Sequence, residues 1–331
     1  MARSAAGAGP TAAVTVRRLR GFAGAAVATG AVTMTLGACG SKGGEGTAPA
    51  TSGPGVGKPP IVLGAKGFSE QRILGQLYAQ ALRARGYDVR LREDIAADRI
   101  HAVLASGQID GYLEYVDTLL SRVVRQTRPQ PSAPAAYDSA KAYERRRGLT
   151  VLDRTPLANV DAVAVKPTFA RQHRLRQVGD LERAGRVTLG GPRELETRRA
   201  RGLDDLRRTY GLTRLSFRPL SIGVQYTALD KAQIQAADVF STDARLRGGR
   251  YTVLADPRHA FGFGHVIPIV NRKVISAEGP AFAQTINAVS AKLTTGAMRE
   301  LNAAVDVDKE TPEAAARRFL VARGLRRPAP Q

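Results

Sequence analysis

The sequence predicts an α/β protein built from two lobes. Short apolar runs of strand length alternate along the chain with segments whose apolar residues recur at helical spacing. The chain has 331 residues, which is too long for one simple small domain, and its hydrophobic content of 43% is ordinary for a globular protein with a sizeable core.

The folded part opens at residue 61 with a strand, 61–64, followed by a helix that Ser69 can cap and Gly86 can end. Residues 89–91 alternate as a half-exposed strand, a short helix around 100–104 closes at Gly107, and residues 109–116 form a third strand. Strands that alternate with helices in this way indicate parallel βαβ units.

The second half continues the pattern after a Pro-rich, exposed connection at 128–134. Further strands are expected at 151–152, 160–165, 187–189, 237–240 and 265–270. Helices are expected near 169, at 203–210 and 225–234, and in the tail from Thr311 onward.

The N-terminus predicts export and lipidation. A basic segment, Arg17, Arg18 and Arg20, precedes an uncharged stretch, 21–36, that is too short and too rich in Gly and Ala for a membrane span. It ends in Leu36-Gly37-Ala38-Cys39, which matches the bacterial lipobox, so residues 1–38 are expected to be a signal peptide and Cys39 the lipidated residue of an extracytoplasmic, membrane-anchored lipoprotein. The Arg pair leaves general and twin-arginine export open, and a chance buried thiol is the alternative for Cys39.

Residues 39–60 are rich in Gly, Ser, Thr, Ala and Pro, which is typical of a flexible tether. Cys39 is the only cysteine, so no intramolecular disulfide can form.

The net charge of +21 has two interpretations. Nucleic-acid binding requires basic residues concentrated on one face, whereas arginine is scattered here and Ala, Arg and Gly are all abundant. The runs 145–147 and 198–201 fall in helix-like segments, where a solvated face is usual. Compositional bias is favoured, no nucleic-acid partner is expected, and some attraction to anionic lipid headgroups remains.

Signatures of catalysis are missing from the sequence. The four histidines lack metal-ligand spacing, no G-x-S-x-G elbow is present, and the acidic pairs are of the kind usually solvated. We therefore expect a binding protein rather than an enzyme, with no cofactor and no metal.

Several segments, in order, resemble one family, the glycine betaine/carnitine/choline-binding proteins of osmoprotectant ABC importers. The resemblance runs from residue 61 to 325 and rests on the segments 61–71, 109–118, 222–229, 240–245 and 301–307. These are similar to the family's opening strand with F-T-E-Q, its I-D-x-Y-P-E-Y-T-G-T, its I-G-x-x-Y-x-A-L, its Y-S-T-D-G-R and its closing segment.

The resemblance implies a type II periplasmic-binding-protein fold, with two lobes, two crossovers and a ligand cleft that closes by a hinge motion. The crossovers are expected near 157–161 and 264–268, so that residues 61–157 and 265–331 form lobe I and residues 158–264 form lobe II. It further implies a monomer that binds a small quaternary-ammonium or other cationic solute and docks on ABC permease subunits.

Carried over position by position, the family's aromatic cage falls on Phe68, Tyr115 and Phe240. Rings suit a quaternary ammonium because such a cation has no N–H to donate but is attracted to aromatic faces. Each ring could instead be an ordinary core aromatic. Ser69, Gln71 and Thr118 are the polar candidates for a ligand carboxylate or hydroxyl, with helix capping as the alternative for Ser69.

The sequence departs from the family at Asp161, which stands where a fourth cage tyrosine is expected. One hypothesis is that this carboxylate shifts preference toward a net cationic ligand such as choline. The alternative is that Asp161 points to solvent or pairs with a nearby arginine. The altered cage also keeps open a different nutrient, of ergothioneine or amine type, and a surface lipoprotein without a transport role is a third possibility.

Overall fold

The structure is a computed structural model that describes residues 52–126, 128–198 and 200–327. The predicted signal peptide, the lipidation site Cys39 and most of the predicted tether lie outside the described residues. Within those three ranges, no helix is both long and apolar enough to cross a membrane.

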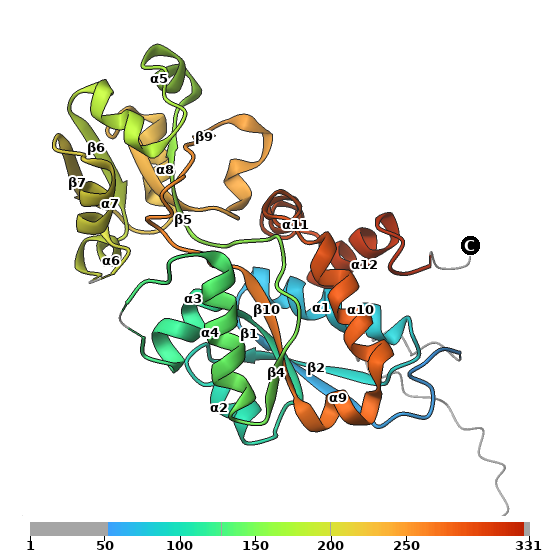
Figure 1. Cartoon of the computed structure of the whole chain (residues 1–331). Coiled ribbons are helices and arrows are strands. Elements are labelled where there is room, and N and C mark those ends of the chain that lie inside the picture. The colour runs from blue at the N-terminus through green and yellow to red at the C-terminus, as the bar shows by residue number, and fades with distance from the viewer. Residues whose placement is uncertain (1–51, 127, 199, 328–331) are drawn as a thin grey trace, which may run out of the picture. The chain divides into compact units, whose positions relative to one another are not determined.

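Lobe I is built on a five-stranded sheet in the order β2-β1-β3-β10-β4 (Figure 1). β1 pairs in parallel with both β2 and β3, while β10 runs antiparallel between β3 and β4. The predicted parallel βαβ units are therefore confirmed. The strands are β1 (Ile61–Lys66), β2 (Val89–Ile95), β3 (Gly111–Tyr115), β4 (Leu149–Val151) and β10 (Val266–Asn271).

Helices cover both faces of this sheet, so β1 and β3 are buried on both sides, as central strands of parallel sheets are. One core cluster joins β1 to side chains of α1, α10, α11 and α12, and a second joins β3 to α2 and α4. The helical elements of lobe I are α1 (Ser69–Arg83), α2 (Ile100–Ala105), α3 (Val116–Thr118), the π-helical turn η1 (Leu119–Val123), α4 (Ala133–Arg145), α9 (Arg272–Glu278), α10 (Pro280–Lys292), α11 (Thr295–Asp306) and α12 (Pro312–Ala322).

Lobe II repeats the same strand arrangement in the order β7-β6-β8-β5-β9. β6 is parallel to β7 and β8, and β5 runs antiparallel between β8 and β9. Its elements are β5 (Asp161–Val165), α5 (Pro167–Gln172), the 3-10 helix η2 (Val178–Ala184), β6 (Val187–Gly191), α6 (Arg193–Thr197), α7 (Leu203–Tyr210), β7 (Leu215–Pro219), α8 (Val224–Asp230), β8 (Ala236–Phe240), the 3-10 segment η3 (Ala244–Gly249) and β9 (Thr252–Val253).

The chain passes between the sheets twice, from β4 to β5 and from β9 back to β10. The two connecting segments touch at an isolated antiparallel bridge between Ala158 and His265. Each sheet thus receives one antiparallel strand directly after a crossover, and that strand pairs with the central strand of its own lobe.

Three local expectations differ from the structure. The Pro-rich connection ends early, because Ser132 caps α4 by accepting a hydrogen bond from the backbone N–H of Ala135 (3.2 Å). Two arginines of the segment expected to be helix-like lie outside a helix, because Arg198 is extended beyond α6 and Arg201 has φ 58°. At the end of the predicted tether, Gly55 packs against Tyr87 and donates to the Arg85 carbonyl (3.1 Å), because a residue without a side chain fits there.

Candidate functional site

The first strand of lobe I leads directly into one predicted site segment. Phe68 follows β1 with extended backbone (φ −140°, ψ 157°), and its side chain is 41% exposed. α1 begins at Ser69, which is half-buried, so the expectation that Ser69 caps this helix is wrong. The N-cap position belongs to Phe68, whose side chain cannot accept a hydrogen bond.

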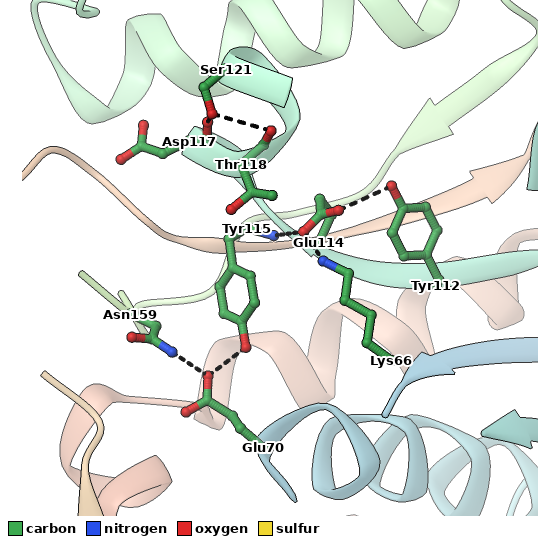
Figure 2. A network of polar contacts seen from close by, with 9 residues as sticks. All are labelled: Lys66, Glu70, Tyr112, Glu114, Tyr115, Asp117, Thr118, Ser121 and Asn159. Carbon is green, nitrogen blue, oxygen red and sulfur yellow. Dashed lines mark hydrogen bonds and ion pairs between the residues drawn. The ribbon is translucent and has the colours of Figure 1, made fainter. Parts of the chain in front are cut away.

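Glu70, in the first turn of α1, is the centre of a buried hydrogen-bond network (Figure 2). Its Oε1 accepts from the hydroxyl of Tyr115 (2.7 Å) and from Nδ2 of Asn159 (2.9 Å). Its Oε2 accepts from Nδ2 of Asn302 (2.8 Å), which also donates to the carbonyl of Thr242 (2.9 Å). One carboxylate therefore connects α1, β3, the first crossover, α11 and the loop that follows β8 of lobe II.

Tyr115, at the end of β3, is only 8% exposed. Burial, with the neighbouring Glu70 second, raises the pKa of its hydroxyl well above the ordinary value, so the hydroxyl stays protonated and donates to Glu70. Nζ of Lys66 lies 5.4 Å from the centroid of the ring. Lys66 is itself buried and forms an ion pair with Glu114, as Figure 2 shows.

Lobe II places Phe240 at the end of β8, directly opposite Asp161 on β5. Opposite residues of an antiparallel pair share one face of the sheet, and so does Asp238, two residues before Phe240. Phe240 is 43% exposed, whereas both acids are buried. Phe240 and the two carboxylates therefore lie on the same face of lobe II.

The Asp161 carboxylate forms an ion pair with Arg198, whose side chain is 42% exposed. Of the two alternatives for Asp161, pairing with a nearby arginine is thus the arrangement in the structure. Burial and the charge of Asp161 raise the pKa of Asp238 well above its ordinary value. Arg198 therefore contacts Asp161, whereas Oδ1 of the neighbouring Asp238 is buried without a hydrogen-bond partner among the described residues.

Another ion pair, unlike that of Asp161, runs from lobe II to lobe I. Arg201, just before α7 of lobe II, contacts the Asp117 carboxylate in α3 of lobe I. The same carboxylate oxygen accepts from the backbone N–H of Phe263 (2.6 Å). Gly262 (φ 92°) passes so close that a Cβ there would overlap Arg201 and Asp117, so this position requires glycine.

The predicted polar residues Ser69, Gln71 and Thr118 all lie in lobe I. Among the described residues, no hydrogen bond or ion pair links their side chains to one another. Gln71 is buried, and both atoms of its side-chain amide lack a hydrogen-bond partner among the described residues. Thr118 is half-buried at the end of α3. An orphaned buried amide is costly to a fold, so Gln71 is the stronger candidate to contact a ligand.

Sequence reasoning missed Glu70, Arg198 and Arg201. Glu70 lies inside one of the family-like segments, but the resemblance gives it no role, and the two arginines fall in a charge run for which a solvated face is the usual interpretation. Their partners are 37 to 232 residues away along the chain, so no local pattern could show them.

Within the described ranges, no group of three or more His, Cys, Asp and Glu side chains could hold a metal ion. A surface hollow of about 450 Å³ lies at the carboxyl ends of β6 and β7, but it is lined by other residues than the predicted ones: Pro192, Arg193, Glu194, Pro219, Leu220, Ser221 and Ile222.

Known proteins resemble this chain over most of its length. Residues 59–322 match the family described as the substrate binding domain of the ABC-type glycine betaine transport system. A glycine-betaine-binding protein of Pseudomonas aeruginosa is 32% identical over 269 residues, which are 78% of this chain and 86% of that protein. An ergothioneine transport permease/ergothioneine binding protein of Helicobacter pylori is 25% identical over 268 residues, 80% of this chain and 48% of that longer protein.

Solved structures agree with the fold. A crystal structure of a glycine betaine/carnitine/choline ABC transporter superposes with a TM-score of 0.74 at 23% identity and covers 80% of this chain and 99% of that chain. Apo YehZ of Escherichia coli gives a TM-score of 0.71 at 22% identity, with the same coverages of 80% and 99%. The expected type II periplasmic-binding-protein fold is confirmed. The family match over most of the chain supports the same conclusion as the motifs: the chain belongs to the extracytoplasmic substrate-binding proteins of ABC-type glycine betaine transport systems.

Proposed function

We propose that this protein captures a quaternary-ammonium osmoprotectant between its two lobes and delivers it to an ABC permease. The observation that carries the proposal is the exposure of two aromatic rings. Among the described residues, Phe68 and Phe240 are the exposed aromatic side chains, at 41% and 43%. They stand at the carboxyl ends of strands of lobe I and lobe II, where ligands of open α/β sheets bind.

The chemistry of the ligand accounts for this exposure. A trimethylammonium group offers no N–H donor, so an aromatic face that attracts a diffuse cation is the suitable partner, worth about 0.5–2 kcal/mol per ring. Burial of Phe68 and Phe240 against the ligand would also remove their apolar surface from water. Tyr115, which is held by its hydrogen bond to Glu70, supplies the third ring of the proposed cage.

The charge of the site favours a zwitterion over a simple cation. Asp161 is already paired with Arg198, so it no longer presents an uncompensated negative charge to the ligand. The half-exposed guanidinium lies on the face that carries Phe240 and can donate in the fork geometry that carboxylates accept. We therefore propose a betaine, with a quaternary ammonium in the cage and a carboxylate received by Arg198, Gln71, Ser69 or Thr118.

The name of the Pseudomonas aeruginosa relative, a glycine-betaine-binding protein, supports this choice. A second candidate is ergothioneine, which also carries a trimethylammonium and a carboxylate and is named in the Helicobacter pylori relative. Its larger imidazole-thione ring would need the space that Asp161 leaves where the family has a tyrosine.

Anchoring completes the proposal. Cys39, outside the described residues, would carry the lipid that holds the protein at the outer face of the cell membrane, and the folded part would act as a monomer. Cys39→Ser is expected to release the protein from the membrane fraction without altering ligand affinity.

The test is isothermal titration of the soluble protein, starting after Cys39, with glycine betaine, choline, carnitine and ergothioneine. Saturable binding of a trimethylammonium ligand, weakened at least tenfold by Phe240→Ala, is the expected result. Phe217→Ala, which removes a half-buried ring elsewhere in lobe II, is the matched control. Absence of binding across all four ligands would refute the proposal.

A further inference from the structure

The Tyr115 ring lies among three charged side chains. Figure 2 shows Lys66 and Glu114 near the backbone end of the tyrosine and Glu70 at its hydroxyl. Lys66 and Glu114 form a buried ion pair, with Lys66 Nζ 5.4 Å from the ring centroid. Glu70 differs from Glu114 because, in the part of the chain that the structure describes, its three hydrogen-bond donors are a phenol and two amides.

The formal charges around the ring therefore sum to minus one. The Lys66–Glu114 pair contributes nothing net, and Glu70 is left without a cationic partner among the described residues. A buried carboxylate without a counter-ion is unfavourable, and its field is weakly screened in the protein interior. A bound cation beside Tyr115 would supply the missing positive charge.

The hydrogen bond from Tyr115 to Glu70 allows the negative charge of Glu70 to act on the aromatic ring. When a phenol donates to a carboxylate, electron density shifts from the O–H bond toward the oxygen and the ring. The face of the ring becomes more negative, and its attraction for a cation increases. The short Tyr115–Glu70 distance, 2.7 Å, is typical of such a charge-assisted bond.

We infer that Glu70 is a specificity-determining residue that acts through Tyr115, and that it makes the site prefer a quaternary ammonium over a neutral ligand of the same shape. The inference rests on the proposed function. Glu70 is a positioning residue, because it touches Tyr115 and is not itself expected to touch the ligand.

A purely structural role must be separated from this one, since Glu70 also holds Asn159 and Asn302. Glu70→Gln keeps the size of the side chain and an oxygen that can accept from Tyr115, but it removes the charge. The new amide N–H₂ can donate to Asn302 Oδ1, which is buried without a partner among the described residues, once the Asn302 amide flips, at the loss of one hydrogen bond to the Thr242 carbonyl. The variant is therefore expected to fold.

The experiment compares choline with its uncharged isostere 3,3-dimethylbutan-1-ol, by titration and by displacement, on wild type, Glu70→Gln, Tyr115→Phe and the double variant. In Glu70→Gln, the affinity for choline is expected to fall about tenfold, the size of one cation–π contact, while the affinity for the neutral alcohol stays within about twofold. In the Tyr115→Phe background the same substitution is expected to change choline affinity by less than about twofold.

Glu144→Gln is the matched control, because Glu144 is another buried glutamate of lobe I and its carboxylate contacts His101 (2.9 Å). It should leave the ratio of the two affinities unchanged. Equal losses for choline and for the alcohol in Glu70→Gln would show that Glu70 only holds the fold, and would overturn the inference. Failure of wild type to bind any quaternary ammonium would instead refute the proposed function, and the inference with it.

Discussion

The two lobes share one strand order but handle a buried acid on the central strand in opposite ways. In lobe I, Glu114 of β3 is paired with Lys66, and both side chains are almost fully buried, at 2% and 3% exposure. In lobe II, Asp238 of β8 has no ion-pair partner among the described residues, and the neighbouring Arg198 is paired with Asp161 instead. Lobe I therefore contains an acid whose charge is balanced by its own partner. The lobe II cluster, defined as Asp161, Asp238 and Arg198, contains two acids and one base.

This difference indicates a division of labour. A buried and neutral ion pair offers no free charge to a ligand, so β3 acts as a rigid support for Tyr115. The lobe II cluster keeps Arg198 half-exposed, and there the carboxylate of the proposed betaine would reach it. We expect substitutions in the lobe I pair to act on folding, and substitutions in the lobe II cluster to act on both folding and ligand preference.

The largest effect is expected from Lys66→Met. Removing the cation leaves Glu114 buried with no counter-charge, which typically destabilises a protein by about 3–5 kcal/mol. Urea unfolding followed by circular dichroism measures the change.

The double variant Lys66→Met/Glu114→Leu is the control for this prediction. A matched apolar pair removes the unpaired charge, so the double variant should be more stable than Lys66→Met alone. A double variant that is less stable than the single one would show that the pair holds the sheet by something other than charge compensation.

The second effect concerns the space around the lobe II acid. The strand registers place Gly191 of β6 where lobe I has Ala65 of β1. A Cβ on Gly191 would lie 2.7 Å from the Cβ of Asp238, so Gly191→Ala should destabilise the protein by about 1–3 kcal/mol. Gly296→Ala in α11 is the control, since its nearest neighbour is 3.9 Å away, and it should be neutral or stabilising. An equal effect of both substitutions in thermal unfolding would contradict the steric argument.

Much of the fold could be predicted from the sequence, because its signals are local. Apolar runs identified β1, β6 and β8, and alternating strands and helices identified the parallel units. Thr311 was expected at the start of the last helix, and it caps α12 by accepting from the Ala314 N–H (3.2 Å). α4 was missed, because the prolines before it suggested a loop whereas Pro134 lies in its first turn, where proline is tolerated.

The site was less predictable, because its contacts depend on distant partners. The sequence shows Asp161 as a departure from the family, but only the folded chain brings Arg198 to it. Glu70 and Asn302 are 232 residues apart in sequence and meet only when α1 and α11 pack. Sequence can identify a ring or an acid at a family position, whereas charge compensation is a property of the three-dimensional neighbourhood.

The lobe II cluster should make the stability of the protein depend on pH. Because the pKa of Asp238 is raised in the folded state, its contribution to stability is fully present below the pKa of the unfolded chain, about 3.9, and is lost as pH rises through the folded pKa. Arg198 opposes this rise, so Arg198→Met should push the pKa of Asp238 further up. The variant should be less stable than wild type by about 1–2 kcal/mol at pH 8, less than for a fully buried pair because solvent screens the half-exposed Arg198, and closer to wild type at pH 5.

Arg250→Met removes an exposed arginine elsewhere in lobe II and is the control for Arg198→Met. It is expected to change the stability little at either pH. A deficit of Arg198→Met that is the same at pH 5 and pH 8, in urea unfolding at both values, would show that the two acids do not share this cation.

The smallest effect is expected where the lobes meet. Arg201 of lobe II pairs with Asp117 of lobe I, which lies between Tyr115 and Thr118 in sequence, so the pair connects lobe II to the proposed binding segment of lobe I. Arg201→Ala should weaken binding of glycine betaine and choline alike, by about three- to tenfold, because it removes a contact between lobes and not a contact to the ligand. Arg208→Ala, whose arginine pairs with Asp205 inside α7, is the control and should change neither affinity. If Arg201→Ala weakened the binding of only one of the two ligands, Arg201 would belong to the binding surface. It would then contribute to ligand selection by lobe II, together with the cluster around Arg198.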